Sequence, residues 1–315
     1  MNVKLRVIAE QQGGVFSRRQ ALASGYTPRQ VRDLLGNGRW VRIRHGQYAE
    51  RPDETEMPDW ERIRLRHLRA IRAAMNSLRP GSVAVSHQSA LVVHGLPLWG
   101  LDLELVHVTR LDGQAGGLTA GVRHHLGVLI PADLAVIDGL LVTTVPRAVV
   151  ETASIVPFES GVVVADAALR RGAFTAGDLE RLQGAIEFWP GGPAARAVLR
   201  FADPLSESVG ESRVRVLMHQ HGLPAPKLQV EFYDAEGLIG RPDFYFDAED
   251  SVVEFDGLLK YSSGEPEVLI REKRREDRLR ALGLHVVRTV WSDLSRPDQL
   301  AATIRRSLNR ARPAA

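Results

Sequence analysis

Two short apolar runs between residues 241 and 257, RPDFYF and SVVEFDG, are typical of neighbouring strands, and three acidic side chains lie on them. Asp243 lies near the start of the first run, and Glu254 and Asp256 lie on the second. Because a buried, unpaired carboxylate is costly, strands seldom carry such acids without a partner. Glu254 and Asp256 are two residues apart and therefore point to the same side of a sheet. We expect the three acids to converge on one site.

A divalent metal ion is the partner that such a set of acids predicts. Mg²⁺ takes oxygen ligands and keeps several of its waters, so carboxylates from adjacent strands can hold it. A bound Mg²⁺ ion can activate a water molecule and neutralise a phosphoryl oxygen during hydrolysis. The alternative interpretation is a solvated edge strand whose acids form ordinary surface salt bridges.

The elements around these strands predict a domain that begins near residue 203, where Asp203-Pro204 marks a loop. Ser206 is a candidate N-cap for a helix that ends at Gly222. Three strand-like runs follow, then a helix from about residue 265 to residue 282, and then the strand LHVVRTVW. The predicted order is helix, three strands, helix, strand.

This order, with Pro242-Asp243 on one strand and Glu254-x-Asp256 on the next, resembles the PD-(D/E)xK nuclease superfamily. The segment VEFDG, the helix REKRREDRLRALG and the strand HVVRTVW are similar to the uncharacterised domain family allied to very-short-patch-repair endonucleases. The resemblance covers about residues 206–296 and implies a restriction-endonuclease-like αβββαβ core. It also implies a Mg²⁺ or Mn²⁺ cofactor and the hydrolysis of DNA phosphodiesters.

The resemblance implies roles for particular residues. Asp243 and Glu254 would be metal ligands, and Glu211 on the preceding helix could complete the metal shell. Asp256, a further candidate ligand, stands where the superfamily pattern has a lysine. Lys260 is the first candidate to replace that lysine and stabilise the attacking hydroxide or the phosphate, and Lys273 is the second.

The helix from about residue 265 to residue 282 is strongly basic. Three of its arginines, Arg271, Arg275 and Arg278, are three or four residues apart and share a face. We expect this face to contact a phosphate backbone.

The first fifty residues consist of short helical segments separated by glycines. Residues 3–12 have apolar positions at helical spacing, Ser17 can cap a second helix, and Thr27-Pro28 can begin a third. The segment RWVRIRHGQYA then alternates as a short basic hairpin does. Three small helices and a basic hairpin predict a winged helix-turn-helix.

In such a domain the third helix enters the major groove of DNA, and the start of the preceding helix contacts phosphates. The candidate DNA-binding residues are Arg29, Gln30 and Arg32 on the third helix, Arg18 and Arg19 on the second, and Arg39, Arg42 and Arg44 on the hairpin. The alternative is a winged-helix module that binds protein and has a solvated basic face.

The run GGVFSRRQALASGYTPRQVRDLL followed by GRWVRIRHGQYA resembles the N-terminal domain of antitoxins of the abortive-infection AbiEi type. The resemblance covers about 50 residues, and the region that follows is also similar to AbiEi-like proteins. It implies operator binding, repression of a toxin–antitoxin operon, and a cognate toxin as a partner.

The middle region, residues 59–202, predicts a mixed α/β domain after an acidic, proline-bearing linker. Five histidines lie between residues 87 and 125: His87, His94, His107, His124 and His125. Their spacings match no recognisable set of metal ligands, and His124 and His125 must face opposite ways on a strand. We therefore expect structural or surface roles for them.

Charge is unevenly distributed along the chain. Residues 1–49 hold nine Lys/Arg against two acids, residues 203–256 hold four against twelve, and residues 257–315 hold thirteen against seven. A basic head and a basic tail on either side of an acidic patch predict a polyanionic partner and one locally acidic site.

The chain has no cysteine, which excludes disulfides and cysteine-based zinc sites. Its first residues hold no apolar core long enough for a signal peptide, and no apolar stretch approaches the roughly 18 residues of a membrane span. These features predict a cytoplasmic location without a membrane partner.

We therefore expect an α/β multidomain protein with a winged helix-turn-helix over residues 1–50, an α/β domain over 59–202 and a nuclease-like domain over 203–315. The favoured interpretation is a DNA-binding protein with a Mg²⁺-dependent endonuclease domain, acting in prokaryotic defence or repair. The competing interpretation is a non-enzymatic, antitoxin-like transcriptional repressor. A third is a scaffold that binds only protein.

Overall fold

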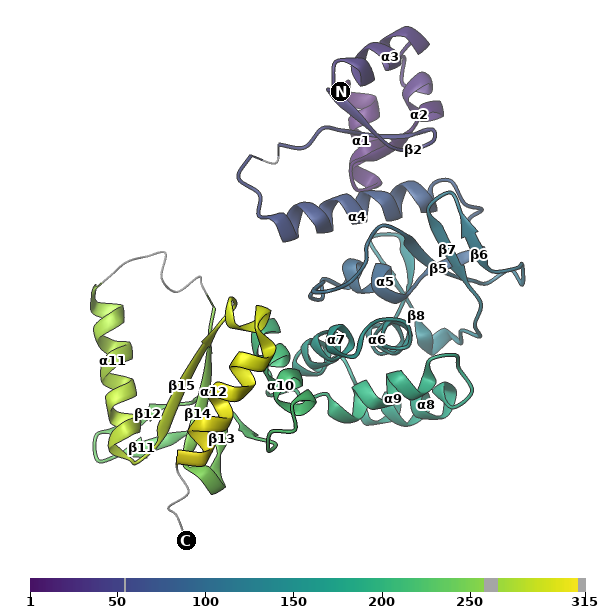
Figure 1. Cartoon of the computed structure of the whole chain (residues 1–315). Coiled ribbons are helices and arrows are strands. Elements are labelled where there is room, and N and C mark those ends of the chain that lie inside the picture. Colours follow the sequence, from purple (N-terminus) through teal and green to yellow (C-terminus); the bar gives the residue numbers. More distant parts are fainter. Residues whose placement is uncertain (54, 258–265, 311–315) are drawn as a thin grey trace. The chain divides into compact units, whose positions relative to one another are not determined.

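The computed structural model describes residues 1–53, 55–257 and 266–310 and has a mixed α/β fold (Figure 1). Its contacts divide the chain into two compact units. The first comprises Met1–Val164 and Ala173–Arg200, and the second comprises Ala165–Gly172 and Phe201–Ala315.

The first unit begins with three short helices and a three-stranded antiparallel sheet of order β1-β3-β2. The elements are α1 (Val3–Gln11), β1 (Val15–Ser17), α2 (Arg18–Ala23), α3 (Pro28–Gly36), β2 (Trp40–Arg44) and β3 (Gln47–Glu50). Ser17 and Thr27 begin α2 and α3 through capping boxes, in which each hydroxyl accepts from the backbone N–H three residues on. The core contains Phe16 packed edge-on against Trp40, with ring centroids 4.7 Å apart. The predicted helices and hairpin are confirmed, and β1 was not predicted because three residues show no periodicity.

A six-stranded sheet of order β6-β7-β5-β4-β9-β8 forms the centre of the first unit. Two of its pairs, β5–β7 and β4–β9, are parallel. Its strands are β4 (Val83–Val85), β5 (Val106–Arg110), β6 (Gly117–Thr119), β7 (Val122–His125), β8 (Leu134–Ile137) and β9 (Leu140–Thr143). The helices of this region are α4 (Asp59–Met75), α5 (His87–His94), α6 (Val145–Ala153), α7 (Phe158–Arg170), α8 (Ala176–Ile186) and α9 (Gly192–Phe201).

The second unit is built on a sheet of order β10-β13-β14-β15, in which β14 and β15 are parallel and joined through α11. Its elements are α10 (Val209–Gln220), β10 (Lys227–Leu228), β11 (Phe232–Asp234), β12 (Gly237–Gly240), β13 (Phe244–Phe246), β14 (Ser251–Asp256), α11 (Pro266–Ala281), β15 (His285–Val290) and α12 (Pro297–Arg310). The core between α10, the sheet and α12 includes Val214, Phe244, Val253 and Ile304. Apolar burial on this face fixes which side chains of β13 and β14 point away from the core.

Two local predictions for the second unit were wrong. Ser208, not Ser206, caps α10, because the Ser206 hydroxyl instead pairs with the hydroxyl of Ser212 at 2.9 Å. The run LQVEFYD is not one strand, because Gln229 has a φ of 54° and turns the chain between β10 and β11. Beyond that turn, β11 and β12 form a separate antiparallel hairpin.

Candidate nucleic-acid interface and carboxylate cluster

Helix α3 presents a polar face that is free of the core. Val31 is buried, whereas Arg29, Gln30 and Arg32 are exposed. Arg29 has only a distant partner, Asp33, with 4.0 Å between Nε and Oδ2. Gln30 is partly committed, because its Oε1 accepts the backbone N–H of Thr27 at 2.8 Å. Its side-chain NH₂ group is therefore the part that can reach a base, a consequence of the capping box that the segment TPRQ encodes.

All but one of the arginines predicted to contact phosphates are exposed. Arg18 and Arg19 are exposed at the start of α2, and Arg39 and Arg42 are exposed at and before the hairpin. Arg44 is half-buried, and its Nη2 lies 3.4 Å from the backbone oxygen of Ala120. Burial lowers the pKa of Arg44 below its ordinary value. Arg44 therefore has a structural contact in addition to its expected role.

In the second unit, β13 and β14 bring two of the three predicted acids together. Phe244 lies opposite Val253 in the antiparallel pair, so Asp243 is close to the end of β14. Its Oδ2 accepts the backbone N–H of Phe255 at 2.6 Å. Glu254 is buried, and burial raises its pKa against the opposing charges of Arg275 and Arg288, while the nearby charge of Asp243 raises it further.

Glu254 has two unequal oxygens. Its Oε1 pairs with Arg275 at 2.7 Å, and its Oε2 is 3.9 Å from Arg288. Among the described residues, no hydrogen-bond partner reaches the buried Oε2. A buried carboxylate oxygen without a hydrogen bond is expensive, which marks this atom as one that a ligand could satisfy.

Gln229 joins Glu211 to Asp243. Its Nε2 lies 3.1 Å from Oε2 of Glu211 and 3.4 Å from Oδ1 of Asp243. Glu211 is buried on α10, where burial raises its pKa. Gln229 holds the left-handed backbone conformation, which is uncommon outside glycine and often marks functional sites. No sequence pattern indicated Gln229, because its role depends on the turn that separates β10 from β11.

Asp256 does not lie beside a described lysine. It pairs with Arg288 on β15 at 3.2 Å, and Arg288 also contacts Glu272 and Glu276 on α11. Lys260 lies outside the described residues, and Lys273 is exposed on α11. Arg288 was not predicted, although the parallel register places it directly opposite Glu254.

The basic face expected on α11 is largely engaged within the unit. Arg275 pairs with Glu254, and Arg278 pairs with Asp234 on β11. Arg271 is exposed. These ion pairs tie α11 to the strands that carry the acids.

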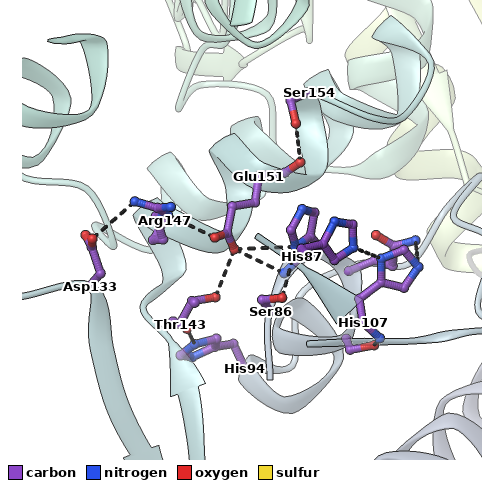
Figure 2. A network of polar contacts seen from close by, with 12 residues as sticks. Ser86, His87, His94, His107, Asp133, Thr143, Arg147, Glu151 and Ser154 are labelled. Atoms are coloured by element: carbon purple, nitrogen blue, oxygen red, sulfur yellow. Dashed lines mark hydrogen bonds and ion pairs between the residues drawn. The ribbon is translucent and has the colours of Figure 1, made fainter. Parts of the chain in front are cut away.

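A second polar network lies in the first unit, beneath α6 (Figure 2). Arg147 donates to Oε1 of Glu151 at 2.9 Å and to Oδ2 of Asp133 at 3.2 Å. The other oxygen of Glu151 accepts the backbone N–H of His87 at 3.2 Å and the hydroxyl of Thr143 at 3.3 Å. All five residues are buried, so the network is a fixed part of the interior.

Three of the five histidines that the sequence left ungrouped meet beside this network. One nitrogen from each of His87, His107 and His125 lies within 4.8 Å of the others, which makes this, within the described part of the chain, the cluster whose atoms could hold a metal ion. Sequence spacing did not reveal it because the residues come from a helix and two strands. His94 lies apart, with Nε2 2.8 Å from the backbone oxygen of Thr143.

None of the described helices combines the length and the apolarity that crossing a membrane requires.

Comparison with known proteins adds two findings. Residues 4–51 match the family model described as "Transcriptional regulator, AbiEi antitoxin", which supports a DNA-binding, antitoxin-like role. Two proteins of Mycobacterium tuberculosis, "Uncharacterized protein MT2308" of strain CDC 1551 / Oshkosh and "Uncharacterized protein Rv2248" of strain ATCC 25618 / H37Rv, are each 32% identical to this chain over 291 residues. The matched region is 91% of this chain and 99% of each relative, so the likeness covers both units.

Proposed function

We propose that this chain, which belongs to the family of these two Mycobacterium tuberculosis proteins, is an antitoxin-type transcriptional regulator. It recognises specific DNA through α3. The observation that carries the proposal is the exposed polar face of α3, with Arg29 and Arg32 directed away from the core. The partners are double-stranded DNA and, as the family match implies, a cognate toxin.

The division of labour follows from side-chain chemistry. Arg29 and Arg32 can each donate two hydrogen bonds to one guanine, and the NH₂ group of Gln30 can donate to an acceptor on a base edge. Arg18, Arg19, Arg39 and Arg42 can neutralise phosphates, which positions the domain without reading sequence. Affinity should therefore fall steeply with salt, while discrimination between sequences should depend on α3.

Fluorescence anisotropy with duplex DNA from upstream of the chain's own coding sequence tests this proposal. We expect Arg32→Ala to weaken binding to the preferred duplex by roughly 5- to 150-fold, the range of one good bidentate base contact. We expect Arg18→Ala to weaken binding to all duplexes alike and to reduce the slope of log affinity against log salt by about 1. Arg310→Ala, which removes an exposed arginine from α12, is the charge-matched control.

Equal loss of affinity in the Arg32 and Arg310 variants would contradict the proposed role of α3. Wild-type protein that binds no duplex in a salt-dependent way would instead favour the protein scaffold.

A second function for the same chain is hydrolysis of DNA phosphodiesters by the second unit. The observation that favours it is the buried Oε2 of Glu254, which lacks a hydrogen bond within the described residues, near the Glu211–Gln229–Asp243 cluster. Carboxylate oxygens are the ligand class of Mg²⁺ and Mn²⁺. The described acids of this unit do not gather as closely as the three histidines do, so a bound ion would have to draw them together. Asp243, Glu254 and Glu211 would hold the ion, with Asp256 as a further candidate ligand.

When bound, the metal ion would supply a more acidic water and would neutralise charge on the phosphate. The chain's own residues would prepare the site. Gln229 contacts the carboxylates of Glu211 and Asp243 and would hold them in place. Arg275 pairs with Glu254 and would balance its charge in the absence of the metal ion. Arg288 is a described cation beside Asp256 that could act in place of the lysine of the nuclease pattern, and Lys260, outside the described residues, and Lys273 stay the candidates that the sequence offers.

Cleavage of plasmid and oligonucleotide DNA in Mg²⁺ or Mn²⁺ tests the second function. We expect Asp243→Asn and Glu254→Gln each to abolish cleavage, and Asp247→Asn to retain it. Asp247 is an acid of the same unit that pairs with Lys227 at the surface, so it controls for the loss of a negative charge.

Two results would count against hydrolysis. Cleavage that survives in both the Asp243 and Glu254 variants would come from a contaminant or another site. If the wild type binds DNA but cleaves none of several substrates, the chain is better explained as a non-enzymatic repressor. The second unit would then serve to contact a partner.

A further inference from the structure

We propose that His87, His107 and His125 form a binding site for a divalent transition-metal ion of the zinc class, with an open coordination position that faces a small pocket. His87 is the first residue of α5, His107 lies in β5, and His125 ends β7. Because β5 and β7 are parallel neighbours with Thr109 opposite His125, His107 and His125 project from the same face of the sheet. The site is distinct from α3 and from the carboxylates and does not rest on the proposed function.

The three rings bring one nitrogen each within 4.8 Å of the others, and the stacked rings of His87 and His125 would have to rotate before both could direct a lone pair at one ion. Nδ1 of His107 lies 2.9 Å from Nε2 of His125, and the rings of His87 and His125 stack with centroids 3.6 Å apart. Zn–N bonds of 2.0–2.1 Å in a tetrahedron place ligand nitrogens about 3.4 Å apart. On metal binding, the His107–His125 nitrogen pair would therefore open by about half an ångström.

The rings are largely shielded from water: His87 and His107 are buried, and His125 is half-buried. Neutral imidazole is the ligand form, and three neutral nitrogens suit zinc-class ions better than Mg²⁺. His87 also has a φ of 52°, a strained conformation that is uncommon outside glycine and often marks functional sites.

Neighbouring side chains hold the outer nitrogens of two rings. Nδ1 of His87 lies 3.0 Å from the hydroxyl of Ser86 and 3.7 Å from Oε2 of Glu151. Such a carboxylate beside a ligating histidine commonly fixes its tautomer. Nε2 of His107 lies 3.0 Å from the amide nitrogen of Gln88. If Nδ1 of His107 binds the metal, its Nε2 carries the proton. A flip of the Gln88 side-chain amide would place its oxygen to accept the hydrogen bond from that Nε2–H.

A pocket of about 230 Å³ is lined by His87 and His125 and would supply room for the open position. Thr109 lines it and is buried, and its hydroxyl has no hydrogen-bond partner among the described residues. Arg147 also lines the pocket and lies 4.2 Å from the centre of the Trp189 ring. Three protein ligands beside such a pocket match the pattern of zinc sites that keep one position for water or a small anion.

Metal titration of the full chain tests the proposal. The protein is prepared without a histidine tag, freed of metal with a chelator, and titrated with Co²⁺ in excess Mg²⁺, which occupies oxygen-only sites. We expect one Co²⁺ per chain, visible bands of tetrahedral nitrogen-ligated Co²⁺, their loss when Zn²⁺ is added, and a rise in thermal midpoint with Zn²⁺.

Three variants locate the site. His125→Gln removes a half-buried ligand and should abolish the Co²⁺ bands, whereas Gln88→Leu should weaken Co²⁺ binding by roughly 10- to 100-fold as an outer partner. His67→Gln, a buried histidine bonded to Leu103 and Ser89 outside the cluster, should bind as the wild type does. DNA binding by each variant serves as the check on folding.

No stoichiometric Co²⁺ or Zn²⁺ binding by the wild type would overturn the proposal, and so would binding that His125→Gln leaves intact. Loss of binding in His67→Gln to the same degree as in His125→Gln would also overturn it, because the effect would then be structural.

Discussion

At the scale of single residues, this chain buries ionisable groups beside specific partners. His67 on α4 is almost completely buried, with Nδ1 2.8 Å from the backbone oxygen of Leu103 and Nε2 2.9 Å from the hydroxyl of Ser89. Burial lowers its pKa to about 4, although the Leu103 contact and the charge of Asp102 oppose the shift. Such groups make stability depend on pH even where no function is involved.

The free energy of unfolding should decrease as the pH falls from about 6.5 towards 4. Over this range His67 binds a proton in the unfolded chain but stays neutral in the folded one. The contribution of this one residue is up to about 3 kcal/mol across that window. We expect His67→Gln to show a smaller loss than the wild type between neutral and acid pH in chemical denaturation. An identical pH dependence in the two proteins would show that His67 is not shielded as described.

Arg275 offers a second test at this scale. Removing it leaves Glu254 buried without its closest cation, so Arg275→Ala should lower the free energy of unfolding by about 3 kcal/mol. Arg278→Ala, on the same helix, breaks a more solvated pair with Asp234 and should cost less. Urea denaturation of the two variants measures the difference. Equal losses of unfolding free energy would contradict the expectation that the buried Arg275–Glu254 pair matters more than the more solvated Arg278–Asp234 pair.

At the scale of elements, close packing decides where the acids lie. Helix α10 crosses β14 with Gly210 directly against Phe255, and a Cβ at Gly210 would lie only 1.9 Å from Cε1 of that ring. Phe255 lies between Glu254 and Asp256 on β14, so its packing against α10 determines where the side chains of both acids lie. A small residue at position 210 is therefore a requirement of the carboxylate cluster.

Gly210→Ala should destabilise the second unit by about 1–3 kcal/mol through overpacking, although alanine favours a helix. Gly184→Ala in α8 is the matched change, because a Cβ there would meet no described atom within 4 Å. We expect the control to be neutral or stabilising by up to about 1 kcal/mol in thermal denaturation. A neutral Gly210 variant would contradict the contact between α10 and β14.

The elements also explain how far the sequence could predict the structure. The caps at Ser17 and Thr27, Pro28 and the alternating hairpin are local signals, so the winged-helix elements were predictable. Gln229 and the histidine cluster were not, because Gln229 acts through a turn in an unusual backbone conformation and the three rings come from separate elements. The pairing of Arg275 and Arg288 with Glu254 depends on register and helix packing, which periodicity does not encode.

At the scale of the whole molecule, one chain carries three chemically different groups of side chains. The arginines of α3 are exposed, the acids Glu211 and Glu254 are buried beside half-buried Asp243, and His87 and His107 are buried beside half-buried His125. The two Mycobacterium tuberculosis relatives match this chain along 91% of its length, so the family match at residues 4–51 concerns one part of a longer shared architecture.

Specific DNA recognition by α3 is the central claim, and hydroxyl-radical footprinting of the full chain on DNA upstream of its own coding sequence tests it most directly. The account predicts a discrete protected segment for the wild type, retained by Arg310→Ala and lost by Arg32→Ala at concentrations that still bind DNA. Uniform reactivity along the DNA at saturating wild-type protein, or a footprint that Arg32→Ala leaves unchanged, would contradict the claim.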